Sequence, residues 1–125
     1  MLFRSALMPA IPWRPPGERA PTTSEIAVCT PLMLRRIELA ASAIGAGATL
    51  LLLGKLPLRM VEPDAATERS RNGTARPLSV LRSHAPALEG IALSHPTMLA
   101  AQPGLRRATW HGLLGLRERL QTDRN

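Results

Sequence analysis

Hydrophobic and polar positions alternate in blocks along this chain, and the blocks predict an order of helices and strands. Apolar residues recur at helical spacing over residues 23–41 and again over residues 105–121, so each segment is predicted to be an amphipathic helix. Thr22 and Glu25 form a capping box that should start the first helix, and Pro31 should kink that helix. The apolar side of the last helix is formed by four leucines: Leu105, Leu113, Leu116 and Leu120.

A long uncharged stretch, residues 39–54, separates the first helix from the middle of the chain. It has 16 residues and falls short of the roughly 20 that a membrane-spanning helix needs. We interpret Thr49–Leu53 as a buried parallel strand ending at Gly54, because a strand covered on both faces is continuously apolar. A membrane-associated segment is the alternative.

The remaining pattern predicts short elements and one domain. A helical turn is expected at Leu56–Val61 and short strands at Leu78–Leu81 and Ile91–Leu93. Alternating strands and helices indicate an α/β fold. We expect a Pro/Arg-rich loop at residues 1–21, a domain at residues 22–122 whose residues 62–90 form an exposed loop region, and a tail at residues 123–125.

Charge and composition narrow the choice of partners and compartment. The net charge is +7, and 15 of the 16 basic residues are arginines, which suits phosphate binding and therefore nucleic acid. A GC-rich genome would produce a similar composition without that function. The single cysteine excludes an internal disulfide and suits a reducing cytoplasm. The apolar run near the N-terminus is interrupted by Pro9 and is too short for a secretory signal.

Two motifs resemble family 4 uracil-DNA glycosylases, in the order and at the approximate spacing of that family. The first is a Pro/Gly loop with two arginines that leads into the capped helix, Pro12-Trp13-Arg14-Pro15-Pro16-Gly17-Glu18-Arg19-Ala20-Pro21-Thr22, followed by Cys29-Thr30-Pro31. The second is Ser94-His95-Pro96-Thr97-Met98-Leu99. Weaker matches are Leu53-Gly54, Arg71-Asn72-Gly73 and the start of the last helix, Arg106–Leu113.

The resemblance implies a fold, an activity and a set of site residues. The fold would be a partial three-layer α/β/α sandwich with a short parallel sheet, incomplete at its N-terminus. The activity would be hydrolysis of the N-glycosidic bond of uracil in DNA, on a base flipped out of the helix. His95 would donate a hydrogen bond to the departing uracil, where negative charge develops. Four arginines would contact DNA phosphates: Arg14, Arg19, Arg106 and Arg107.

The chain also departs from the family at functional positions. The N-terminal half of the family is absent, with its acidic Gly-Glu-Ala-Pro-Gly loop and its first two cluster cysteines. Cys29 matches the last of four iron–sulfur ligands, but Trp13 stands in the place of the third, so no cluster is expected. Pro9 replaces the asparagine that reads uracil, Ala101 replaces an arginine and Glu18 replaces an asparagine.

These departures remove functional groups more than scaffold, so we expect a truncated and diverged relative. Its glycosylase activity would be impaired or incomplete in this chain alone, and a protein partner could supply the missing half. Uncovered apolar surface would follow from the missing strands. The alternatives are a DNA-binding remnant without catalysis, a small membrane-associated protein and a chain without function.

Overall fold

The structure of the chain, a computed structural model, describes residues 5–13, 15–45, 47–62, 76–77, 85 and 88–122. These residues form a mixed α/β fold in which helices outweigh strands. The elements follow one another in this order: the 3-10 helix η1 (Pro16–Glu18), α1 (Thr23–Ile44), β1 (Thr49–Leu53), α2 (Lys55–Val61), β2 (Arg76–Pro77), β3 (Glu89–Leu93), α3 (Pro96–Ala101) and α4 (Leu105–Thr122).

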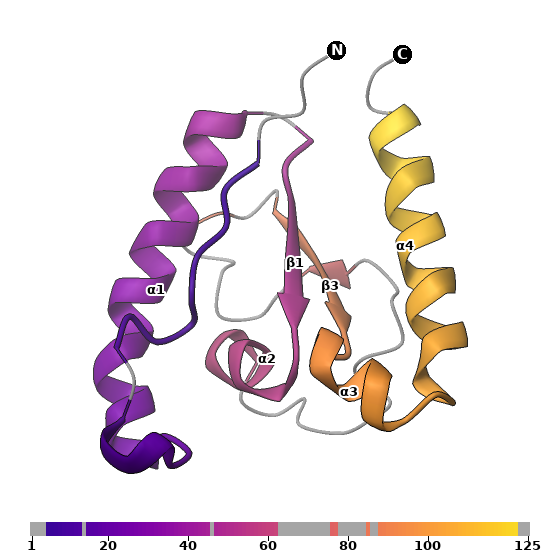
Figure 1. The fold of residues 1–125 in the computed structure, drawn as a ribbon. Coiled ribbons are helices and arrows are strands. Elements are labelled where there is room, and N and C mark those ends of the chain that lie inside the picture. The colour runs from indigo at the N-terminus through magenta and orange to yellow at the C-terminus, as the bar shows by residue number, and fades with distance from the viewer. Residues whose placement is uncertain are drawn as a thin grey trace.

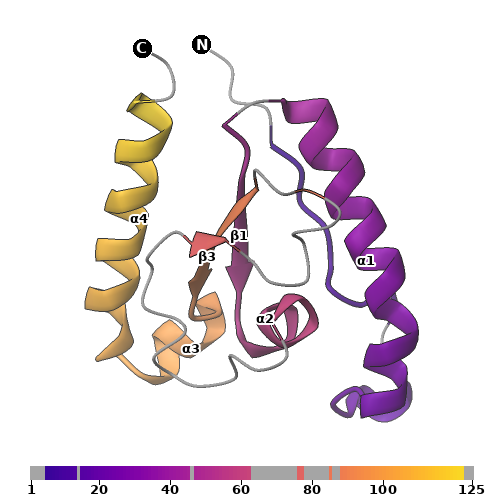
Figure 2. The same cartoon turned by 180° about the vertical axis from the view of Figure 1, so that it is seen from behind.

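The sheet is built around one parallel pair of strands. β1 pairs with β3 in register, from Thr49 opposite Glu89 to Leu53 opposite Leu93. The two-residue strand β2 pairs antiparallel with the other edge of β3, which gives the order β1-β3-β2. Figures 1 and 2 show α1 and α4 on opposite sides of the strands, with α2 and α3 at the end where β1 and β3 finish.

Helix α1 begins where the capping box predicts. The Thr22 side chain accepts from the Glu25 N–H, and the Glu25 carboxylate accepts from the Thr22 N–H. The helix continues through Pro31 to Ile44, three residues beyond the expected end, and stops at Gly45, whose φ is 95°. A positive φ costs glycine little, and this explains the end of the helix at that residue.

The uncharged stretch is divided between a helix end and a strand, as predicted, but the strand is not buried along its length: only Leu52 of β1 is buried, and Leu51 is 37% exposed. Residues 39–44 finish α1 and residues 49–53 form β1. Over the described part of the chain, none of the helices combines the length and the apolar character that crossing a membrane requires.

The core is aliphatic. Trp13 and Trp110 are both at least half exposed, so neither fills the interior. Cys29, Met33, Leu34 and Ile37 recur at helical spacing on the buried face of α1. They pack with buried residues from the strands, from α2 and from the segment before β3: Leu52, Leu58, Met60, Val61, Leu88 and Ala92.

Strand β3 is covered on both faces, which fits its central place in the sheet. Its residues Gly90 to Leu93 are all buried. The strand begins at Glu89, two residues before the predicted start, and an ion pair between Glu89 and Arg119 of α4 joins its beginning to that helix (2.8 Å). The Arg119 side chain is half-buried in this contact, with 38% of its surface exposed.

Several predictions of local structure need correction. Leu88 and Gly90 are buried, so the end of the 62–90 segment belongs to the core and the sheet, not to an exposed loop. Helix α3 was not predicted, although Pro96 occupies a favourable first helical position. Leu113 is 39% exposed, whereas Leu105, Leu116 and Leu120 on the predicted apolar side of α4 are half-buried.

The other predictions of elements divide into confirmed and undescribed ones. The helical turn at Leu56–Val61 is confirmed as α2, and the last helix is confirmed as α4. Residues 5–13 contain no strand, which agrees with the loop expected there. The predicted strand Leu78–Leu81 and the tail at residues 123–125 lie outside the described residues.

Candidate functional site at the carboxyl ends of the parallel strands

The candidate site lies where β1 and β3 end side by side. The Gly54 N–H, just after β1, donates a hydrogen bond of 2.9 Å to the carbonyl oxygen of Leu93 at the end of β3. Helices α2 and α3 follow directly, and α1 and α4 both begin at this end of the sheet (Figure 1). Ligands of open parallel sheets bind at the carboxyl ends of the strands, so this edge is where chemistry is expected.

Gly54 makes room for the histidine of the second motif. Its φ is 97° and its ψ is −176°, a conformation that essentially only glycine adopts. A Cβ atom on Gly54 would lie 3.3 Å from Cβ of His95, closer than ordinary van der Waals contact. The glycine after β1 therefore allows His95 to approach the end of that strand.

His95 caps α3 and thereby fixes the state of its own ring. Its Nδ1 accepts a hydrogen bond from the Thr97 N–H (3.2 Å) and lies 2.8 Å from the Thr97 hydroxyl oxygen. A backbone N–H can only donate, so Nδ1 carries no proton in this arrangement. The neutral ring then has its proton on Nε2, and the exposed His95 presents that N–H as a hydrogen-bond donor.

A cavity of about 970 Å³ adjoins the histidine and extends along β1. One wall is the segment of residues 5–10, and the other includes all of β1. Aliphatic side chains of α1 and α4 form much of the lining. Three of the polar residues that line the cavity, Lys55, His95 and Thr97, lie at the end beside the strand ends, and the other two are Ser5 and Thr49.

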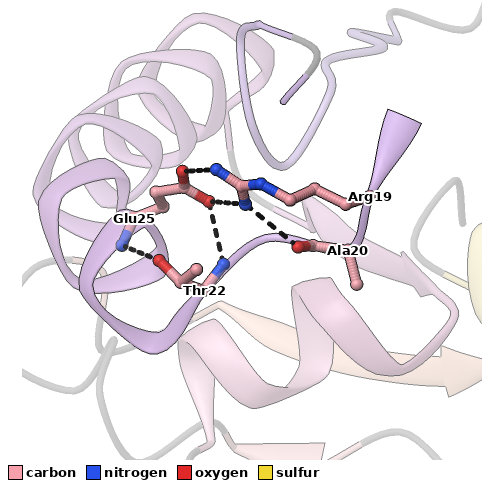
Figure 3. Close-up of polar contacts among 4 residues, drawn as sticks. All are labelled: Arg19, Ala20, Thr22 and Glu25. Atoms are coloured by element: carbon pink, nitrogen blue, oxygen red, sulfur yellow. Dashed lines mark hydrogen bonds and ion pairs between the residues drawn. The ribbon is translucent and has the colours of Figure 1, made fainter. Parts of the chain in front are cut away.

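Arg19 is bonded to the cap of α1 (Figure 3). Its two terminal nitrogens bond the two Glu25 carboxylate oxygens at 2.9 and 2.5 Å, and Nη1 also donates to the Ala20 carbonyl oxygen (3.3 Å). The Arg19 hydrogen bonds, together with the Thr22 N–H, lower the pKa of Glu25 to about 2. The same hydrogen bonds raise the pKa of Arg19. The Arg19 guanidinium thus joins the Pro/Gly loop to the first turn of α1.

The other three arginines are distributed differently. Arg106 and Arg107 are exposed on the first turn of α4, and Nε of Arg106 donates to the Leu99 carbonyl oxygen of α3 (3.0 Å). They are therefore at the same end of the sheet as His95. Arg14 lies outside the described residues.

Cys29 does not fit an iron–sulfur cluster. Its side chain is 1% exposed and packs in the aliphatic core between α1 and the sheet. A four-iron cluster needs four thiolate ligands, and the sequence has one cysteine. Among the residues that the structure describes, no three His, Cys, Asp or Glu side chains gather as a metal site would require.

The sequence pointed to His95 but not to the residues that control it. Gly54, Lys55 and Thr97 were not singled out as site residues. A signal for the first was present, since glycine directly after a buried strand marks a close approach or a turn. Proline after His95 likewise marks the start of a helix, which would have placed the Thr97 N–H within reach of the ring.

Comparison of the chain with protein-family models, with curated proteins and with solved structures gave no match.

Proposed function

We propose that this chain is a uracil-DNA glycosylase-like domain whose hydrogen-bond donor is His95. The proposal starts from the two motifs that resemble family 4 of these enzymes. It includes the finer fold expected from that resemblance, a partial three-layer α/β/α sandwich that is incomplete at its N-terminus. It also includes action on DNA in the cytoplasm and a protein partner that supplies the half of the family domain with the acidic loop.

The observation that carries the proposal is the hydrogen bonding of His95. Cleavage of the N-glycosidic bond leaves negative charge on the departing uracil, and a neutral donor stabilises that charge as it develops. Because Nδ1 accepts from Thr97, the ring offers its Nε2–H for this purpose without needing to be protonated. The ring also borders the cavity at the carboxyl ends of the strands, where a flipped base could enter.

DNA binding is assigned mainly to the start of α4. Arg106 and Arg107 are exposed there, and the N-terminal end of a helix favours phosphate. Arg14 completes the set on the Pro/Gly loop. Arg19 contributes differently from its expected role, because its guanidinium is bonded to Glu25 and holds the Pro/Gly loop against the first turn of α1.

The proposed activity is weak in this chain alone. Pro9 cannot offer the side-chain amide that reads uracil, and Ala101 lacks the guanidinium of the family motif. No acidic loop is available in the sequence before Pro12 to position the attacking water. The chain therefore retains the donor that stabilises the leaving group, whereas base reading and water activation depend on other groups.

The test is uracil release from an end-labelled, single-stranded oligonucleotide, followed by alkali cleavage. We expect slow strand cleavage that is lost in His95→Ala. His95→Asn should also lose it, although asparagine preserves a good helix cap and hence α3. His111→Ala, an exposed histidine of α4, is the matched control and should keep the activity. Cleavage that survives in both His95 variants, or no cleavage by folded wild-type protein, would contradict the proposal.

A second candidate function is DNA binding without catalysis. The observation that favours it is a net charge of +7 carried almost entirely by arginine, combined with the loss of the uracil-reading amide at Pro9. Such a protein would bind DNA with and without uracil equally. Its affinity would fall steeply with salt, because phosphate contacts release counterions. The uracil-release assay separates the two functions, because a protein that only binds DNA releases no uracil at any salt concentration.

A further inference from the structure

The outer edge of β1 has no strand beside it in the described part of the chain. In the sheet order β1-β3-β2, β1 pairs on one side only. Gly54 donates to β3, and alternate residues of a strand turn their backbone groups to opposite sides. Leu50 and Leu52 therefore also face β3, while the N–H and C=O groups of Leu51 and Leu53 face outward.

This edge opens into the cavity instead of ending at a flat surface. Residues 5–10 form the opposite wall, and Figure 1 shows that segment running beside β1 in the same chain direction. The cavity extends along the whole strand, from Thr49 to Leu53, and on to Lys55 at the start of α2. The unpaired edge thus faces a long space with a second stretch of backbone on its far side.

The lining of the cavity is apolar on both faces of the sheet. Met33 and Ile37 of α1 contribute on one side, and Leu116 and Leu120 of α4 contribute on the other. A strand placed here would have both rows of side chains covered. Strands of that kind are continuous runs of aliphatic residues, in contrast to the alternating pattern of half-exposed strands.

Two polar features favour a peptide over a purely apolar ligand. The Leu51 and Leu53 N–H groups need hydrogen-bond acceptors once water is displaced from the edge, and a hydrocarbon chain has none to offer along its length. The hydroxyl of Thr49, a residue that also lines the cavity, is buried and has no hydrogen-bond partner among the described residues. A second backbone beside β1 provides donors and acceptors at strand spacing, about 4.8 Å away.

We propose that this cavity is a slot for an extended, aliphatic segment of another polypeptide, which pairs with the outer edge of β1 and adds a strand to the sheet. The main-chain hydrogen bonds provide affinity, and the aliphatic lining selects the side chains. This inference uses the sheet edge and the cavity and does not depend on glycosylase activity.

The first experiment compares two synthetic peptides. The probe has a lysine at each end and five valine or isoleucine residues between them, with a fluorescent label. Its twin has the same side chains but carries N-methyl groups on the five central residues, which removes the backbone donors. We expect saturable binding of the probe by fluorescence anisotropy and at least about tenfold weaker binding of the twin. Binding should also slow hydrogen exchange at the Leu51 and Leu53 amides.

The second experiment changes the edge of the strand. Leu51→Pro removes an outward N–H and leaves the ladder with β3 intact, because proline is tolerated where its missing N–H faces away from the partner strand. We expect probe binding to fall by about tenfold or more. Val28→Ala is the matched control, since Val28 is exposed on α1 outside the cavity, and binding should not change.

Three results would overturn the slot. One is equal binding of probe and N-methylated twin, which would identify a cavity for apolar molecules in general. Another is unchanged binding in folded Leu51→Pro. The third is no saturable binding of the probe up to its solubility limit. Because no DNA is present, these results do not depend on the outcome of the uracil-release assay.

Discussion

Replacing Gly54 by alanine should both destabilise the fold and disturb His95. The backbone at Gly54 has φ 97° and ψ −176°, and a residue with a Cβ in this region pays about 1–3 kcal/mol of strain. In addition, the new methyl group would lie 3.3 Å from Cβ of His95. Cβ is fixed to the backbone, so relief requires movement of the start of α3 and cannot come from rotation of the ring.

Gly45 provides the matched control for this prediction. Its φ and ψ are 95° and −160°, so Gly45→Ala pays similar backbone strain. A Cβ there would meet no atom within 4 Å. Both alanines also restrict the unfolded chain to the same extent, and that effect cancels in the comparison. The difference between the two variants therefore isolates the contact with His95.

The assays are urea unfolding followed by circular dichroism and NMR of the histidine ring protons. We expect both variants to lose stability, with the larger loss in Gly54→Ala. The His95 ring signals should shift in Gly54→Ala alone. Equal losses with unmoved His95 signals would refute the close approach of Gly54 and His95. Wild-type stability in both variants would refute the positive φ angles from which the argument starts.

Two further predictions concern the cap of α1. Thr22→Ala removes the hydroxyl that accepts from the Glu25 N–H, so the free energy of unfolding should fall by about 1 kcal/mol in urea titrations, and Thr22→Ser should restore most of it. The Glu25 pKa is about 2 in the folded chain against 4.5 for the free group, so its contribution to stability is present above about pH 4.5 and is lost as pH falls towards 2. Glu25→Gln should remove the loss of stability between pH 4.5 and 2 that comes from Glu25. An NMR titration of the Glu25 carboxyl in the wild-type protein tests the cause: a midpoint near the free value would contradict the bidentate bond to Arg19.

The elements that the sequence predicted well are those with local signals. Thr22 and Glu25 are three residues apart, and their reciprocal hydrogen bonds depend only on the first turn of α1. The uncharged run before Gly54 was resolved into helix end and strand by its length and its glycines. These signals involve only a few neighbouring residues, so the structure that they predict does not depend on contacts with the rest of the chain.

The parts that were missed depend on contacts between distant segments. Glu89 and Gly90 are poor strand formers, yet β3 begins there because Glu89 pairs with Arg119 and the register with β1 extends to Thr49. Arg19 was interpreted as a phosphate contact, because the sequence does not show that the loop bends back to bring its guanidinium against Glu25. The approach of Gly54 to His95 requires the parallel pairing of β1 and β3, which no local pattern specifies.

The candidate site and the proposed slot share one strand. His95 follows β3, whereas Gly54, which leaves space for it, follows β1. The hydrogen bond from Gly54 to Leu93 joins the ends of the two strands. Among the described residues β1 is paired on one side only, so its end is held less firmly than the end of a central strand. A segment paired with the outer edge of β1 would restrain Gly54 and, through it, the start of α3 where His95 caps the helix. Binding of a peptide in the slot needs no DNA, and by holding β1 more firmly it would fix the position of the His95 Nε2–H donor.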